Sequence, residues 1–212
     1  MNENKANHTG VRRLFIRVSI AAFVFVAACA TLQTEQYVKD GRVALMTGRP
    51  DDAVKYFSRA AESNPNYKTA YVLRESVWTY LGRAYYETGK YPEARTTLDK
   101  ALASDNNDYV ARLYLGMTLV RSNDPDRGRA EMENALNGIY EWLENLSSDS
   151  PEGNYWDTNK QIRKSIASGL AEKPAAIELV VTAQRVGKQL EEEIARAQRD
   201  NVHSLYNQES NN

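Results

Sequence analysis

The stretch Trp78–Asn107, "WTYLGRAYYETGKYPEARTTLDKALASDNN", has the pattern of two helices joined by a tight turn. Its first half carries large apolar residues at three- and four-residue steps, which is typical of an amphipathic helix. Gly89 then stands where this helix would end, and Pro92 and Glu93 stand in the first turn of the next one. A helix pair of this kind leaves one apolar face uncovered, so it predicts a neighbouring pair that covers it.

Two further copies of the pattern flank this stretch. Residues 112–138 repeat it at a spacing of 34, which pairs Leu81 with Leu115, Gly82 with Gly116, and Ala101 with Ala135. Residues 37–65 repeat it at a spacing of 41, which pairs Gly48 with Gly89, Ala53 with Ala94, and Ala60 with Ala101. The second spacing exceeds the first by seven residues, and we place these at "KTAYVLR", residues 68–74, as two further helical turns.

These copies resemble tetratricopeptide repeats. The pattern is most complete in the middle copy, at Trp78, Leu81, Gly82, Tyr85, Gly89, Ala94, Leu98 and Ala101. The first copy departs from it at Asp40, and the third at Arg112 and Gly128. The resemblance implies an all-α fold, a short solenoid of about three helix pairs over residues 34–146, and a function in protein binding. The expected helices are 34–47, 51–63, 68–88, 92–103, 108–122 and 125–146.

The sequence after the repeats predicts a polar loop, residues 147–156, and C-terminal helices within residues 157–206. Asp157 is placed to cap the first helix, through about Leu170, and Pro174 opens a long final helix. This helix has an apolar seam of Leu179, Ala183, Val186, Leu190, Ile194 and Ala197. The seam fits either a helix that caps the last repeat or a helix that pairs in a homodimer or with a partner. The run Glu191–Glu193 reads as a solvated helix face, and residues 207–212 as a disordered tail.

The start of the chain has the organisation of a secretory signal. Four basic residues precede Val18–Ala28, an apolar run of eleven residues that is shorter than the roughly 20 a membrane-spanning helix needs. "VAAC", residues 26–29, resembles the lipobox of bacterial lipoproteins. The resemblance implies a signal peptide over residues 1–28, diacylglyceryl and acyl groups on Cys29, and a lipidated linker over residues 29–33. Ala30 directly after the cysteine, where that family has Asp for inner-membrane retention, favours the outer membrane, facing the periplasm.

Two other interpretations of Cys29 stay open at this stage. One is a structural, buried cysteine, and the other is a plain signal peptide cut near Ala28 or Ala30. Cys29 is the single cysteine of the chain, so no disulfide can form within it.

Composition argues against several classes of function. Without residues 1–28 the chain has 23 basic and 27 acidic residues, a net charge of −4, which lacks the basic excess of a nucleic-acid-binding protein. His203 is the single histidine after the signal, so neither a Cys/His metal site nor a Ser-His-acid triad can be assembled. We therefore expect no enzymatic activity, no metal and no cofactor beyond the lipid.

In tetratricopeptide arrays the inner face is lined by the first helix of each pair, and the resemblance carries partner binding to these positions. They are Arg42, Leu45, Tyr80, Arg83, Tyr86, Tyr114 and Met117, with Met46 and Glu87 on the same helices. Tyr, Arg and Met are enriched in the anchors of protein interfaces. The alternative is that a neighbouring repeat or the C-terminal helices cover several of these side chains.

Two functional hypotheses follow from these patterns. The first is a membrane-anchored scaffold of the bacterial envelope that binds an envelope protein during complex assembly. The second is an accessory protein of a transporter that binds a small ligand in a pocket lined by Tyr80, Tyr86 and Tyr114. A closed pocket favours the second hypothesis, and an open groove opposes it.

Overall fold

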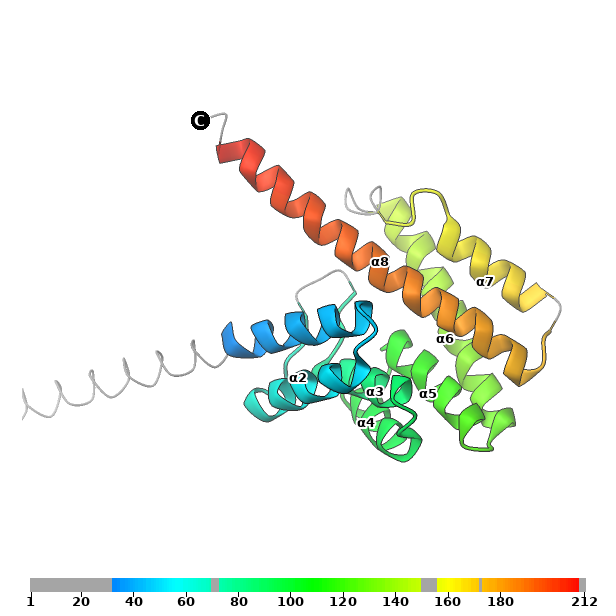
Figure 1. Cartoon of the computed structure of the whole chain (residues 1–212). Coiled ribbons are helices and arrows are strands. Elements are labelled where there is room, and N and C mark those ends of the chain that lie inside the picture. Colours follow the sequence, from blue (N-terminus) through cyan, green and yellow to red (C-terminus); the bar gives the residue numbers. More distant parts are fainter. Residues whose placement is uncertain (1–31, 70–72, 150–155, 172, 210–212) are drawn as a thin grey trace, which may run out of the picture.

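The computed structural model describes residues 32–69, 73–149, 156–171 and 173–209, and these are mainly α-helical. The fold is an all-α helical-repeat solenoid with two further C-terminal helices, as predicted (Figure 1). Its helices are residues 32–46, α2 (Pro50–Ser63), α3 (Val77–Glu87), α4 (Tyr91–Ser104), α5 (Tyr109–Arg121), α6 (Pro125–Asp149), α7 (Gln161–Ala171) and α8 (Ala176–Glu209). Within the described ranges none of the helices is long and apolar enough to cross a bilayer.

The turns inside the three helix pairs repeat in register. Gly48 and Gly89 both adopt a positive φ, of 71° and 73°, and Asn123 takes the equivalent place in the third pair with φ 64°. This left-handed conformation is open to glycine and, at little cost, to asparagine. Proline stands in the first turn of the second helix of each pair, where its missing N–H leaves no hydrogen bond unmade. The two helices of each pair are therefore joined by the same kind of turn, a residue with positive φ followed by a proline.

A glycine against a large side chain sets the distance between the two helices of each pair. A Cβ atom on Gly41, Gly82 or Gly116 would lie 2.5–2.6 Å from Phe57, Leu98 or Met132 respectively. The third pair differs in that a Cβ on Gly116 would also lie 2.7 Å from a backbone atom, the carbonyl oxygen of Gly128. Backbone lies against backbone there, so the space cannot be opened by rotating a side chain.

We expect Gly116→Ala to lower the free energy of unfolding by about 1–3 kcal/mol, because α5 and α6 must separate to admit the methyl group. Asn134→Ala, the control, places alanine at an exposed position of α6 and should change the free energy of unfolding by less than about 0.5 kcal/mol. Urea denaturation of the two variants measures the difference. A stabilised Gly116→Ala protein would show that helix propensity outweighs this close contact.

The prediction of a helix over residues 68–88 was wrong in its first part. α3 begins only at Val77, and Ser76 caps it by accepting a hydrogen bond from the backbone N–H of Thr79. The chain before it folds back on itself, since Val77 N–H donates to Tyr67 O at 3.0 Å and Thr69 N–H donates to Glu75 O at 3.0 Å. The described residues before Val77 thus lie outside the helix, and they form one isolated antiparallel bridge, Lys68 to Ser76. Residues 70–72 lie outside the described ranges.

The apolar seam of α8 is buried within the chain. Leu179, Ala183, Val186, Leu190 and Ile194 are all buried, and Ala197 is half-buried. Most of the seam joins the larger of two core clusters, together with side chains of α5 and α6. The helix therefore packs along the last repeat as a cap, which leaves little of the seam for a second copy of the chain.

α7 is fixed by the residue predicted to cap it. The Asp157 carboxylate accepts hydrogen bonds from the backbone N–H groups of Ile162, at 2.9 Å, and Arg163, at 3.2 Å. The Arg163 side chain binds the same carboxylate at 3.0 Å. The helix itself begins at Gln161, later than the prediction of 157.

Three predicted boundaries differ from the structure. Helix α6 runs to Asp149, into the predicted loop, because residues 147–150 contain neither proline nor glycine. Helix α8 runs to Glu209, so residues 207–209 of the predicted disordered tail are helical. Residues 32 and 33 of the predicted linker belong to the first described helix. The predicted signal peptide and Cys29 lie outside the described residues.

Candidate functional site

Helix α8 crosses the inner face of the repeats, where partner binding was predicted (Figure 1). It packs against α5, α6 and α7, and its side chains also reach the helix over residues 32–46 and α3. Gln184 donates a hydrogen bond to the Tyr86 hydroxyl at 3.2 Å. The inner face is thus occupied by a helix of the same chain.

A buried carboxylate of α8 holds two arginines of the repeats. Oε1 of Glu191 accepts a hydrogen bond from Arg42 Nε at 2.7 Å, and Oε2 accepts one from Arg83 Nη1 at 2.8 Å. All three side chains are buried, with Glu191 only 4% exposed. Arg42 and Arg83 occupy equivalent places in consecutive repeats, 41 residues apart. Charge-assisted hydrogen bonds of this kind are short and directional, so Glu191 fixes the register of α8 on the repeats.

A second buried acid, Glu75, adjoins this cluster. Burial away from water, and next the negative charge of Glu191, raise the pKa of Glu75 to about 8, although the Tyr80 hydroxyl and Arg83 act in the opposite direction. Glu75 is therefore largely protonated at neutral pH in the folded protein. The cluster then contains two guanidinium cations and one carboxylate, Glu191, which the two arginines share.

The raised pKa of Glu75 makes the stability depend on pH. The unfolded chain releases this proton near pH 4.5 and the folded protein only near pH 8, so unfolding releases a proton between these values. The free energy of unfolding should fall with rising pH across this window, by up to about 1.4 kcal/mol per pH unit. Glu75→Gln should remove this contribution and be more stable than the wild type at pH 7.5.

Urea denaturation of the wild type and Glu75→Gln at pH 5.5 and pH 7.5 measures the effect. Glu62→Gln, on the exposed face of α2, is the control and should keep the wild-type difference between the two pH values. An unchanged pH dependence in Glu75→Gln would contradict the assignment of a protonated Glu75.

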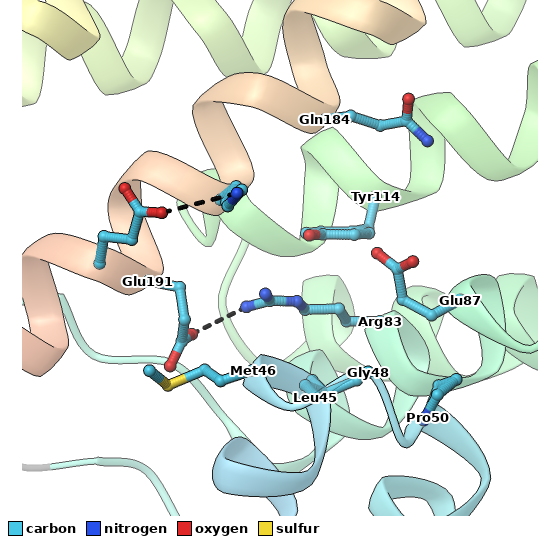
Figure 2. Close-up of a pocket in the computed structure, with 11 residues that line it drawn as sticks. Leu45, Met46, Gly48, Pro50, Arg83, Glu87, Tyr114, Gln184 and Glu191 are labelled. Atoms are coloured by element: carbon cyan, nitrogen blue, oxygen red, sulfur yellow. Dashed lines mark hydrogen bonds and ion pairs between the residues drawn. The ribbon is translucent and has the colours of Figure 1, made fainter.

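A partly open cavity remains between α8 and the repeats (Figure 2). Its volume is about 530 Å³, within the range of small-ligand and side-chain pockets. Its lining comes from the end of the first described helix (Leu45, Met46), the turn after it (Gly48), the start of α2 (Pro50), α3 (Arg83, Glu87), α5 (Tyr114) and α8 (Gln184, Lys188, Glu191, Glu192). Figure 2 shows Arg83 extended toward Glu191. The Arg83 guanidinium also lies 5.4 Å from the centre of the Tyr114 ring, a cation–π contact.

The structure separates the seven residues that were predicted to bind a partner. Leu45, Arg83 and Tyr114 come together in the cavity wall. Tyr80 and Met117 lie in the interior, Tyr86 is buried against Tyr91 and Tyr114, and Arg42 is buried against Glu191. Six of the seven are buried, which agrees with the alternative that α8 and the neighbouring repeat cover several of these side chains, and partner binding by them stays a prediction. Of the three tyrosines expected in a ligand pocket, Tyr114 lines the cavity and Tyr80 and Tyr86 do not.

The interpretation of Glu191–Glu193 as a solvated face was wrong for Glu191. Glu192 is exposed and Glu193 half-buried, but Glu191 is buried and is the central residue of the site. A signal for it was present in the sequence. Two arginines at equivalent inward-facing positions need a carboxylate as a partner if they are buried, and Glu191 directly follows the seam residue Leu190.

Comparisons with known proteins agree with this architecture. Residues 44–114 match the tetratricopeptide repeat family. The match covers α2, α3 and α4 and most of the inner-face residues of the first two pairs. Tetratricopeptide repeats typically serve as non-enzymatic binding scaffolds, in agreement with the expectation of a protein that binds other proteins and is not an enzyme.

A related protein carries repeats of the same kind in a much longer chain. Anaphase-promoting complex subunit 3 of Schizosaccharomyces pombe is 33% identical to this chain over 93 residues. The alignment covers 44% of this chain and 13% of the relative. The similarity is therefore confined to a repeat segment and does not extend to the whole relative.

Proposed function

We propose that this protein is a lipid-anchored scaffold of the bacterial cell envelope, with repeats that bind a partner protein during assembly of an envelope complex. The observation that carries the binding role is the cavity between α8 and the repeats, which is lined by side chains of α8 and of all three repeats. The tetratricopeptide repeat match supports binding of a protein rather than catalysis. The name of the yeast relative, a subunit of a complex, supports a role in assembly.

The proposed anchor is Cys29. The basic residues, the apolar run and "VAAC" support processing as a lipoprotein, with Cys29 as the attachment point. Two or more acyl chains anchor a protein stably in a membrane, whereas one binds only marginally. Ala30 supports the outer membrane, with the repeats facing the periplasm. Such an anchor would raise the effective concentration of the repeats toward partners at the same membrane.

The anchor is tested by intact mass and membrane fractionation of the full chain with a C-terminal tag, beside Cys29→Ser. The wild type should gain the mass of a diacylglyceryl group and acyl chains and sediment with membranes, and Cys29→Ser should do neither. Ala30→Ser, at the next residue, is the control and should remain lipidated. A wild-type protein without added mass in the soluble fraction would contradict the proposed anchor.

Partner binding is tested by cross-linking intact envelopes before purification through the tag. A specific envelope protein should be recovered with the wild type and lost, or much reduced, with Cys29→Ser. Recovery of equal amounts with both would show that the partner binds without the anchor. Recovery of no specific protein with the wild type would contradict the scaffold role.

A further inference from the structure

The lining of the cavity beside α8 contains more carboxylates than cations. Its lining contains two cations, Arg83 and Lys188, and three carboxylates, Glu87, Glu191 and Glu192. Both cations are already paired with carboxylates of α8: Arg83 lies 2.8 Å from Glu191, and Lys188 lies 3.8 Å from Glu192. Among the described residues, no cation lies within ion-pair distance of Glu87. The cavity therefore offers one accessible carboxylate, Glu87, for which no salt bridge forms among the described residues, although the charge of Arg83 acts on it from a longer distance.

Glu87 is also placed to receive a group that enters from outside. It stands at the C-terminal end of α3 and is exposed, whereas the paired Arg83 and Glu191 are buried. Figure 2 shows its carboxylate directed toward the Tyr114 ring, away from the Arg83–Glu191 pair. The negative ends of helix dipoles favour cations near a helix C-terminus, which adds to the effect of the carboxylate.

The other wall of the cavity is apolar. Leu45, near the end of the first described helix, is half-buried, Pro50 at the start of α2 also lines this wall, and Met46 is 54% exposed. A long side chain can lay its methylene groups along such a wall while its charged end reaches a carboxylate. Methionine is flexible and polarisable, so Met46 can adapt to an apolar residue next to that side chain.

We propose that this cavity binds a basic side chain, arginine or lysine, of a partner protein. The cationic end lies at Glu87, the aliphatic stem packs on Leu45 and Pro50, and an apolar residue of the partner next to it packs on Met46. An acidic side chain fits poorly, because it would meet three carboxylates while both lining cations are already occupied. This inference rests on the proposed function as a protein-binding scaffold and adds the chemistry of the partner segment.

The test uses the methyl resonances of methionine in the full chain. Met46 lines the cavity, whereas Met117 and Met132 are fully buried and serve as internal controls in the same spectrum. The probes are three blocked tripeptides, acetyl-Leu-X-Leu-amide, in which X is arginine, the neutral and isosteric citrulline, or glutamate. The arginine peptide should shift the Met46 resonance and leave Met117 and Met132 in place. Its affinity should exceed that of the citrulline peptide by a factor of about three to five, the effect of one exposed ion pair.

Glu87→Gln should abolish this preference for arginine over citrulline. Glu93→Gln, an exposed change of the same kind on α4, should preserve it. Both variants alter exposed side chains, so thermal unfolding should confirm wild-type stability for each. Equal binding of the arginine and citrulline peptides, or stronger binding of the glutamate peptide, would overturn the proposed charge preference while leaving the scaffold role in place. If none of the three peptides shifts the Met46 resonance, the proposal that the cavity binds a basic side chain is wrong. The proposed scaffold function is tested separately, and it fails only if cross-linked envelopes yield no partner.

Discussion

Replacing Glu191 with alanine is expected to lower the free energy of unfolding by about 3–5 kcal/mol. The change removes the carboxylate that the buried Arg42 and Arg83 share, and burying a charge without its carboxylate is costly. For a domain of this size the loss corresponds to a decrease in melting temperature of roughly 6–20 °C. Thermal and urea denaturation of the purified variant measure both quantities.

Glu192→Ala is the matched control for this prediction. Glu192 is the next residue of α8, and its ion pair with Lys188 is solvent-exposed, so its removal should cost less than about 0.5 kcal/mol.

A second control distinguishes the effect of the buried charges from the effect of lost packing. The triple variant Arg42→Met, Arg83→Met and Glu191→Leu removes all three charges together and should recover much of the stability, because apolar replacement of a buried ion pair is often neutral. A stability loss in Glu191→Ala no larger than in Glu192→Ala would contradict a structural role for the buried pair.

Phe57→Ala should cost a similar amount, about 3–5 kcal/mol, but in a different part of the molecule. Phe57 is fully buried, its ring stacks on Tyr80 at 5.3 Å, and it fills the space above Gly41. Phe57 and Tyr80 belong to the smaller core cluster, formed by the first helix pair and α3. Repeat proteins are stabilised mainly by contacts between neighbours, so the damage should remain close to the first pair.

Hydrogen exchange locates this loss. Amides of residues 32–63 in Phe57→Ala should exchange much faster than in the wild type, whereas those of α5 and α6 should keep most of their protection. Lys55→Ala, an exposed change on the same helix, should leave both regions unchanged. Uniform loss of protection along the chain would show instead that the two core clusters unfold as one unit.

Much of the fold could be predicted because its signals are local and repeated. The turns at Gly48 and Gly89, the prolines that follow them and the glycines at helix contacts recur at fixed spacings. The seam of α8 was visible for the same reason. The later start of α3 was missed because the alanine, leucine and tyrosine residues before Ser76 are compatible with a helix, and only the cap at Ser76 fixes the helix start. Helix propensity alone could not exclude the predicted helix over residues 68–88.

The candidate site was harder to predict because it depends on contacts between distant residues. Arg42 and Arg83 were predicted to lie at equivalent inward-facing positions, but their partner Glu191 is 149 and 108 residues away in the sequence. The periodicity of α8 shows that one face is buried without showing which surface covers it. The alternatives of an open groove and a covered groove could therefore be separated only once the position of α8 was known.

Site-specific photo-cross-linking in intact cells tests most directly whether the cavity beside α8 is the partner-binding site. A photoreactive phenylalanine analogue replaces Met46 in the cavity or, as the control, Val181, which is 55% exposed on α8 and does not line the cavity. We expect one specific envelope protein to be linked from position 46, less of it when Glu87→Gln is also present, and none from position 181. Equal capture from both positions, or capture from 181 alone, would contradict the account.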